Sequence, residues 1–113
     1  MNNIIRQEPE TLDRVARYKL YIDNDRQLKN MSDGDAIVVT AFGYWSKDDG
    51  TAMLSLYLED GTSIVTMSPT AINSFFLIID GLGIDLNSEK LPLKIRKSRS
   101  NKGREFYEYV YSM

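Results

Sequence analysis

The sequence predicts a mainly β protein with three strands, then a helix, then two more strands. Two observations carry this prediction. Runs rich in β-branched and aromatic residues alternate with turn signals, and a helical pattern of apolar residues follows the third run. The length of 113 residues suits one domain with a hydrophobic core. The strands are expected at residues 35–45, 51–59, 62–67, 92–98 and 105–111.

The first predicted strand, residues 35–45, has too few polar positions to lie on an open surface. Gly43 falls inside it and predicts a bulge or a sharp bend of the kind that a small barrel needs. Asp49-Gly50 and Asp60-Gly61 are hairpin signals on either side of the second strand. Alternate leucines of that strand are expected to face the core: Leu54, Leu56 and Leu58.

A helix is predicted directly after the third strand. Ser68 is suited to cap free backbone amides, and Pro69 loses no hydrogen bond at the first helical position. Gly81 can take the left-handed conformation that closes a helix. The apolar side of this helix, which its spacing assigns to the core, consists of Ile72, Phe75, Phe76, Ile79 and Leu82.

Residues 1–30 are expected to form a partly helical N-terminal extension. The first eight residues show no pattern and predict a loose start. Pro9 and the acids around it favour a helix from Glu10 to about Tyr21. Strand-like alternation later in the segment keeps the other interpretation open: Tyr18, Leu20 and Ile22.

The composition removes several classes of function. The chain has no cysteine and no histidine, which excludes disulfides, thiolate nucleophiles and the commonest general base and metal ligand. The N-terminal residues lack the apolar run of a secretion signal, and no stretch approaches the roughly 20 apolar residues of a membrane span. We therefore expect a cytoplasmic protein that has no cofactor and is not an enzyme.

Acidic residues offer one catalytic alternative. Carboxylates are preferred ligands of magnesium, so a metal-dependent nuclease is one interpretation of the acids between residues 33 and 60. All but Glu59 lie at or beside a turn, where aspartate is expected for its local backbone hydrogen bonds. The set is Asp33, Asp35, Asp48, Asp49, Glu59 and Asp60.

Positive charge is concentrated in the last quarter of the chain. Residues 90–104 hold seven cations and no acid, whereas residues 31–89 hold one cation, Lys47. The basic stretch leads directly into the aromatic residues of the last predicted strand. Cations that neutralise phosphates beside rings that stack on bases are typical of single-stranded nucleic-acid binding. Lysines and arginines that only keep an edge hairpin soluble are the alternative.

Four features of the sequence are shared with one family: Asp35-Ala36-Ile37-Val38-Val39, the Asp60-Gly61 turn, Ser68-Pro69, and a long basic loop ending in Gly103-Arg104. Together with the order of elements, they resemble the oligonucleotide-binding (OB) fold, a five-stranded barrel with its helix between strands three and four. The chain looks in particular like the small single-stranded-DNA-binding proteins of phages and mobile elements. The resemblance covers residues 31–111. The barrel domain itself is expected to span residues 31–113.

The resemblance implies binding across the second and third strands, flanked by the loops that join strands one to two and four to five. Carried onto this chain, the implied contacts are Tyr44, Trp45, Lys47, Tyr57, Arg99, Lys102 and Arg104. The basic hairpin itself adds Lys94, Arg96, Tyr107 and Tyr109. In this hypothesis the cations follow the phosphates, while Trp45, Tyr57 and Tyr107 stack on bases.

Two orientations stay open at this point. Trp45 would plug the barrel mouth instead of stacking if its side chain pointed inward. In the last strand either the tyrosines or Phe106 and Val110 fill the inside, because only one face can do so. The amphipathic character of tyrosine favours Tyr107 and Tyr109 outward.

The predicted function is single-stranded DNA binding with little sequence preference, and the sequence does not separate DNA from RNA. A barrel this small contacts few nucleotides, so a homodimer or higher assembly is expected. One alternative is a protein-interaction barrel, an inhibitor or an assembly subunit, whose interface is the Tyr- and Arg-rich hairpin. Another is a carbohydrate or small-ligand barrel that uses the same face.

Overall fold

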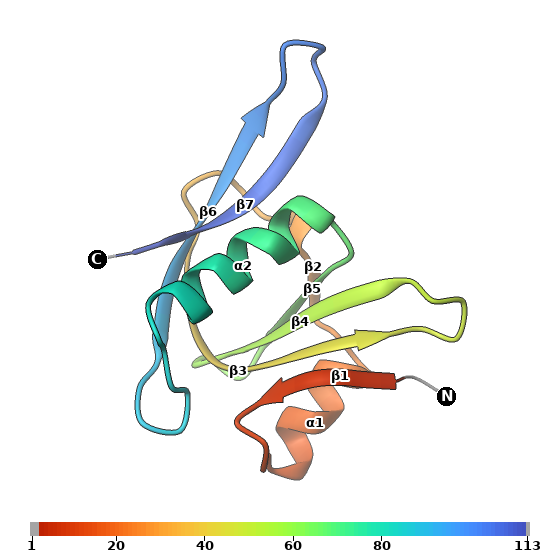
Figure 1. Ribbon diagram of the computed structural model, residues 1–113, viewed down its shortest axis with the longest axis vertical. Coiled ribbons are helices and arrows are strands. Elements are labelled where there is room, and N and C mark those ends of the chain that lie inside the picture. The colour runs from red at the N-terminus through yellow and green to blue at the C-terminus, as the bar shows by residue number, and fades with distance from the viewer. Residues whose placement is uncertain (1–2, 113) are drawn as a thin grey trace.

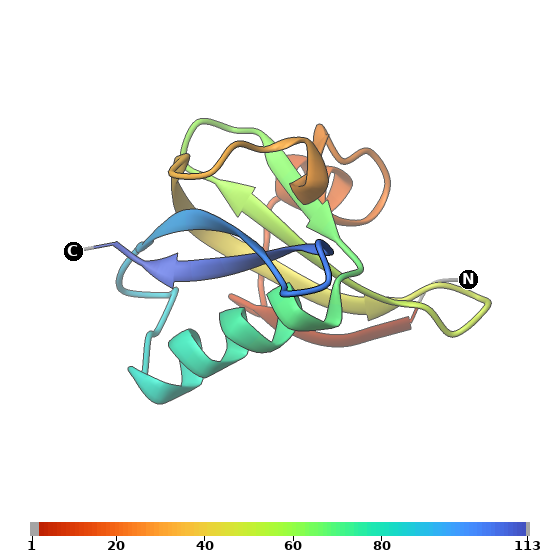
Figure 2. The same ribbon diagram turned by 90° about the horizontal axis from the view of Figure 1, so that it is seen from above.

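The computed structural model describes residues 3–112, which form one curled, mixed β-sheet with a helix on each side (Figures 1 and 2). The five strands expected from the sequence correspond to β3 through β7. In chain order the elements are β1 (Asn3–Glu8), α1 (Arg14–Tyr21), β2 (Arg26–Gln27), a 3-10 turn (Leu28–Asn30), β3 (Ala36–Ser46), β4 (Ala52–Leu58), β5 (Ser63–Thr66), α2 (Pro69–Gly81), β6 (Leu91–Arg99) and β7 (Glu105–Tyr111).

Strand β3 is the centre of the sheet. One of its edges pairs with β4. Its other edge is shared, because residues 36–39 pair with β6 and residues 42–46 pair with β1. The strand order is β2-β5-β4-β3-β6-β7, with β1 beside β3. Since β6 and β1 leave the same edge of β3 at different points, the β6–β7 hairpin diverges from the rest of the sheet (Figure 1).

The sheet is a curled half-barrel. The outer edge of β5 is taken by the short strand β2, which runs parallel to it. At the other end of the order, the backbone N–H of Tyr109 in β7 donates to Ser74 Oγ of α2 at 2.9 Å. Within residues 3–112 no pairing joins β5 to β7. The strands expected from the sequence therefore follow in the expected order around a sheet that is open on one side.

The main core lies between the sheet and α2. Phe42 of β3 meets Phe75 of α2 edge-on, with 5.0 Å between ring centroids, and both are fully buried. As the sequence predicted, Ser68 caps this helix and Pro69 lies in its first turn. The leucines expected to face the core are buried in it: Leu54, Leu56 and Leu58.

The opposite face of the sheet is covered by α1 (Figure 2). Ala16 and Leu20 of this helix are buried, and Tyr21 packs on a second, smaller core made of Trp45, Met53 and Val65. Strand β4 is consequently buried on both faces. Side chains that alternate along β4 therefore enter the main core on one face and the second core on the other, and neither face is open to solvent.

Residues 3–8 form β1 instead of the loose start that the sequence predicted for residues 1–8, of which residues 1 and 2 lie outside the described part of the chain. Arg6 joins this strand to α2 by two hydrogen bonds to Asp80, at 3.0 Å (Nη1 to Oδ2) and 2.8 Å (Nη2 to Oδ1), and its guanidinium lies 5.3 Å from the centroid of the Phe76 ring. Contacts with residues far along the chain thus stabilise a segment that has no pattern of its own. Helix α1 begins at Arg14, later than expected, because Asp13 accepts the N–H of Ala16 and caps it.

Gly43 marks a close contact rather than a bulge. It pairs in regular register with Ser55 and with Gln7, and the register shift between β3 and β4 lies elsewhere, between Val39 and Ala41. The ring of Tyr21 lies on Gly43, so that a Cβ added there would overlap the tyrosine hydroxyl and come within 2.7 Å of two ring carbons. The predicted bulge is wrong, and the missing side chain makes room for α1.

Candidate nucleic-acid interface

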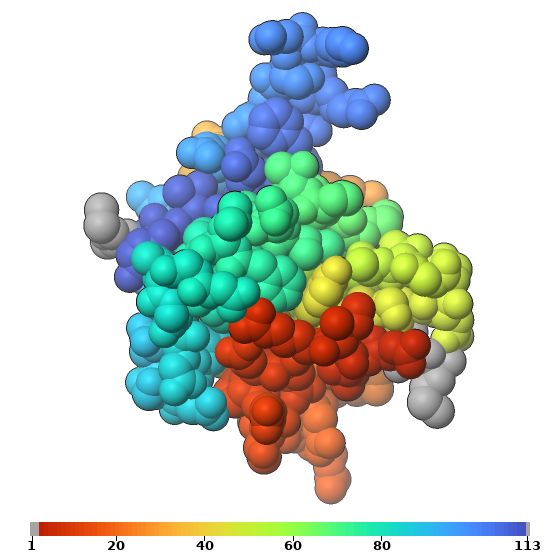
Figure 3. Space-filling view, in the orientation of Figure 1, coloured from red at the N-terminus to blue at the C-terminus, as the bar shows by residue number. Residues whose placement is uncertain are grey.

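The basic region of the sequence forms a hairpin that stands out from the body of the molecule (Figures 1 and 3). It consists of β6, β7 and the turn 100–104, which we call the basic arm. The turn is closed by hydrogen bonds from Ser100 N to Arg104 O (2.8 Å) and from Gly103 N to Ser100 O (2.9 Å). Gly103 has a φ of 79°, which a residue with a side chain rarely adopts. Six cations and two acids lie in the arm.

Both faces of the arm carry cations because the hairpin extends beyond the core. On the face that turns toward α2, Ile95 is buried, but Lys97 and Arg99 further along the same face are exposed. Lys94 and Arg96 lie on the opposite face. An extended phosphate chain would therefore meet positive charge on either side of the arm.

Acids of β7 neutralise part of this charge. Arg96 lies 3.2 Å from Glu108, while Glu105 pairs with Arg99 at 3.2 Å and with Lys97 at 3.8 Å. Exposed ion pairs of this kind contribute about 0–1 kcal/mol each, so a phosphate can replace these carboxylates at little cost. The exposed cations of the arm that have no ion pair within residues 3–112 are Lys94, Lys102 and Arg104.

The tyrosines of β7 face inward, contrary to the predicted orientation. Tyr109 is 2% exposed and packs edge-on against Phe75, 6.0 Å between centroids. Its predicted outward orientation is wrong, and its buried side chain is not available as a contact. Tyr107, one pleat nearer the tip, is half-buried, donates its hydroxyl to the Lys29 carbonyl at 2.9 Å, and has the Lys97 ammonium 5.4 Å from its ring centroid. Tyr107 therefore stays a candidate contact.

Trp45 is buried between the sheet and α1 instead of being available for stacking. It is 5% exposed, its indole N–H donates to Ser55 Oγ at 3.0 Å, and Tyr21 packs edge-on against it at 6.1 Å. Both the stacking role and a place in a barrel mouth are wrong for this residue. The face of β4 and β5 that the family resemblance implied as the binding surface is covered by α1, and Tyr57 on that face is half-buried.

Tyr44 points to the other side of β3, where it lines a cleft of about 530 Å³ beside the start of α2. Its half-buried ring meets that of Phe76 edge-on, with 5.2 Å between centroids. Met67 at the end of β5 is an exposed apolar wall of the same cleft. Sequence reasoning placed Phe76 in the core and Met67 in the third strand, and predicted neither as a contact. Lys47, predicted as a contact, is exposed in the turn after β3.

The acids of the turns hold local backbone groups. Asp49 accepts the N–H of Thr51 at 2.9 Å, and this hydrogen bond lowers the pKa of its carboxyl. Asp60 accepts the hydroxyl of Thr62 at 2.6 Å and the N–H of the same residue at 2.9 Å, and these two hydrogen bonds lower the pKa of its carboxyl. Asp33 accepts the N–H of Lys97 at 2.8 Å and so attaches the base of the arm to the loop before β3. Over residues 3–112 no three acidic side chains gather closely enough to hold a metal ion.

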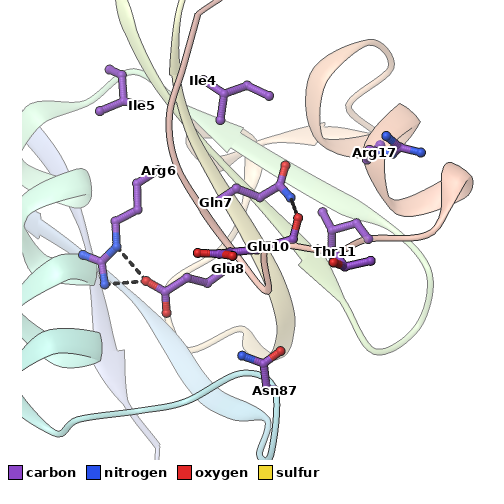
Figure 4. Close-up of a pocket in the computed structure, with 10 residues that line it drawn as sticks. Ile4, Ile5, Arg6, Gln7, Glu8, Glu10, Thr11, Arg17 and Asn87 are labelled. Atoms are coloured by element: carbon purple, nitrogen blue, oxygen red, sulfur yellow. Dashed lines mark hydrogen bonds and ion pairs between the residues drawn. The ribbon is translucent and has the colours of Figure 1, made fainter.

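A cleft of about 1150 Å³ lies away from the arm, between β1 and the segment leading into α1 (Figure 4). Its polar side chains are engaged in contacts that shape the chain. Arg6 donates to Glu8 at 2.7 Å, and Gln7 donates to the carbonyl oxygens of Pro9 and Glu10 at 3.2 and 2.8 Å. This cleft is built from structural contacts of the N-terminal segment.

Two buried tyrosines should ionise late. Burial raises the pKa of Tyr21 to about 12 and the pKa of Tyr109 well above its ordinary value. Because the unfolded pKa is about 10, this contribution to stability is complete below about pH 10 and is lost as the pH rises through about 12. In an absorbance titration of the folded protein, Tyr21→Phe should remove part of the tyrosinate absorbance that develops near pH 12. An unchanged titration curve in that range would contradict the prediction.

No family model matches the chain, and no curated protein or solved structure compared with it gives a significant match. Among residues 3–112, neither helix is long and apolar enough to cross a membrane.

Proposed function

We propose that this protein binds single-stranded DNA with little sequence preference, using the basic arm. The observation that carries the proposal is the concentration of exposed positive charge on one projecting hairpin, six cations against two acids. A phosphate chain along the arm meets Lys94, Lys102 and Arg104 without displacing an ion pair of the residues that the structure describes. Neutralised phosphates release counterions, which supply much of the affinity in such complexes.

Half-buried aromatic rings support contact with bases as well as phosphates. Tyr107 lies in the arm itself, beneath Lys97, and Tyr44 lies with Phe76 in the cleft at the start of α2. Stacking of a base on an aromatic ring is worth about 1–3 kcal/mol and is tolerant of sequence. Trp45 and Tyr109 have no part in this mechanism because both are buried.

The order of the elements supports the proposal by its resemblance to OB-fold proteins that bind single strands. Strands β3, β4 and β5, helix α2 and the β6–β7 hairpin follow one another as in that family. We infer an OB barrel that is open between β5 and β7. Its binding surface is the arm and the cleft at the start of α2, since α2 covers the rest of that side of the sheet and α1 covers the other side.

The proposal is tested by fluorescence anisotropy with a labelled oligo-dT, measured against a duplex of equal length at several salt concentrations. Each phosphate contact adds about 0.7 to the steepness with which log K falls as log salt rises. One contact therefore strengthens binding roughly fivefold when the salt concentration is lowered from 1 M to 0.1 M. Arg104→Ala should therefore weaken binding about fivefold. The triple change of Lys94, Lys102 and Arg104 to alanine should weaken it about a hundredfold and lower the slope by about 2.

Arg17→Ala is the matched control. Arg17 is an exposed arginine on α1, and its side chain has no ion pair within residues 3–112. The helix that carries it, α1, lies at the end of the molecule opposite the tip of the arm (Figure 1). Its removal should leave affinity and salt slope unchanged. Absence of binding at micromolar protein in low salt, or equal loss in Arg17→Ala and Arg104→Ala, would contradict the proposal and favour the arm as a protein interface.

A further inference from the structure

Helix α1 has an apolar stripe on its outer face, in addition to the buried side that covers the sheet. Val15, Tyr18 and Ile22 are 59%, 47% and 74% exposed. Their spacing of three and four residues places them on one face of the helix and its last turn, roughly opposite the buried Ala16 and Leu20. A surface helix of a monomer needs only one apolar face, so this second stripe calls for a partner.

The ends of the stripe carry opposite charges. Arg14 is the first residue of α1 and is exposed, while Asp23 follows its last turn with 59% of its side chain exposed. The nearest cation to Asp23 is Lys19, at 4.0 Å, and Lys19 is held more closely by Asp25 at 2.7 Å. Asp13, directly before Arg14, has its carboxylate turned back to cap the helix, where it accepts the N–H of Ala16 at 2.8 Å. The outer face of α1 is therefore positive at Arg14 and negative just beyond its end at Asp23.

We propose that this face binds a second copy of the same chain, with the two α1 helices antiparallel about a twofold axis at Tyr18. In this arrangement a residue that precedes Tyr18 in one copy faces the residue that follows Tyr18 by the same number of positions in the other copy. Arg14 of each copy then lies beside Ile22 and Asp23 of the other, and the apolar stripes pack together. A twofold interface requires a surface that is complementary to itself, and a stripe with opposite charges at its ends meets this condition only in the antiparallel direction.

The position of α1 leaves the rest of the molecule free for other contacts. The helix and the tip of the basic arm lie at opposite ends of the molecule (Figure 1). Ile4 adds an exposed apolar side chain on the α1 side of the sheet, because it is directly opposite Trp45 across the β1–β3 pair. The dimer is independent of nucleic-acid binding, since none of its contacts belongs to the arm.

The test is sedimentation equilibrium or light scattering over a wide range of protein concentration, without nucleic acid. The wild-type chain should be a dimer. Tyr18→Glu and Ile22→Glu should each raise the dimer dissociation constant at least about tenfold, because each substitution occurs twice across the axis. Leu77→Glu is the control: Leu77 is an equally exposed apolar residue on α2, and its change should leave the dimer intact.

A charge exchange tests the antiparallel geometry without removing apolar surface. Arg14→Asp alone and Asp23→Arg alone should weaken the dimer severalfold, and the two together should restore it, since the pair is then reversed on both sides of the axis. Circular dichroism would show whether each variant remains folded. A wild-type monomer at submillimolar concentration would overturn the proposal. A dimer that survives Tyr18→Glu with Ile22→Glu, or a charge exchange that does not restore it, would do the same.

Discussion

Gly43→Ala is expected to lower the free energy of unfolding by about 2–3 kcal/mol, the usual cost of forcing an extra carbon into a packed site. The new Cβ would overlap the ring of Tyr21, whose hydroxyl is fixed by a 2.8 Å hydrogen bond to Gln7. In a strand, alanine in place of glycine otherwise gains about 0.5–1 kcal/mol of backbone entropy. Overlap outweighs this gain because the Tyr21 ring can move aside only by losing its hydrogen bond to Gln7 and its edge-on contact with Trp45. Urea unfolding measures the difference.

A double-mutant cycle identifies the cause of the Gly43 effect. In a Tyr21→Ala background the space above Gly43 is empty, so Gly43→Ala should become neutral or slightly stabilising, with a coupling energy of about 2 kcal/mol. Gly81→Ala is the matched control. Gly81 is the last residue of α2, and a Cβ added there would have no other atom within 4 Å. Alanine at this position should stabilise the helix by up to about 1 kcal/mol. Equal losses in both backgrounds would show that Tyr21 is not responsible.

Trp45→Ala is expected to have the largest effect on stability, a loss of about 3–5 kcal/mol. The indole fills the space between β3 and α1, and its removal leaves Tyr21 without its ring partner and buried Ser55 without the indole N–H. Trp45→Phe keeps most of the apolar volume and should lose about half as much. Thermal unfolding of the three proteins ranks these effects.

Trp45 also distinguishes a structural role from a stacking role. It is the single tryptophan of the chain, so its fluorescence reports on one site. Because the indole is buried beneath α1, saturating oligo-dT should leave its emission unquenched, and Trp45→Phe should bind with unchanged affinity. Strong quenching, or a loss of affinity in Trp45→Phe comparable to one stacked base, would return this residue to the binding surface.

Local signals in the sequence were sufficient for the central strands and α2. Leu54, Leu56 and Leu58 alternate because one face of β4 meets the main core, and Ser68 with Pro69 begins α2 by hydrogen bonding that involves only neighbouring residues. The turn at Gly103 likewise depends on local geometry. Such features are visible in sequence because the interactions that cause them span only a few residues.

In the N-terminal layer, which is formed by β1 and α1, the sequence predicted the helix but neither β1 nor the packing of α1 on the sheet, because those interactions are long-range. Arg6 in β1 is fixed by Asp80, and Tyr21 in α1 by Gln7 and the space above Gly43. None of these contacts has a periodic signature. The layer buries the second face of β4, and this burial is what removed Trp45 from the predicted site.

For the candidate site, the sequence determined the charge and the tertiary structure determined the exposure. A run of seven cations followed by alternating tyrosines is visible without coordinates. Which cations are paired depends on the register that sets Arg96 opposite Glu108 and Arg99 opposite Glu105. Which face of β7 is inside depends on α2, whose Phe75 packs against Tyr109. Alternation specifies that two faces differ, and only the element packed against one of them decides which is buried.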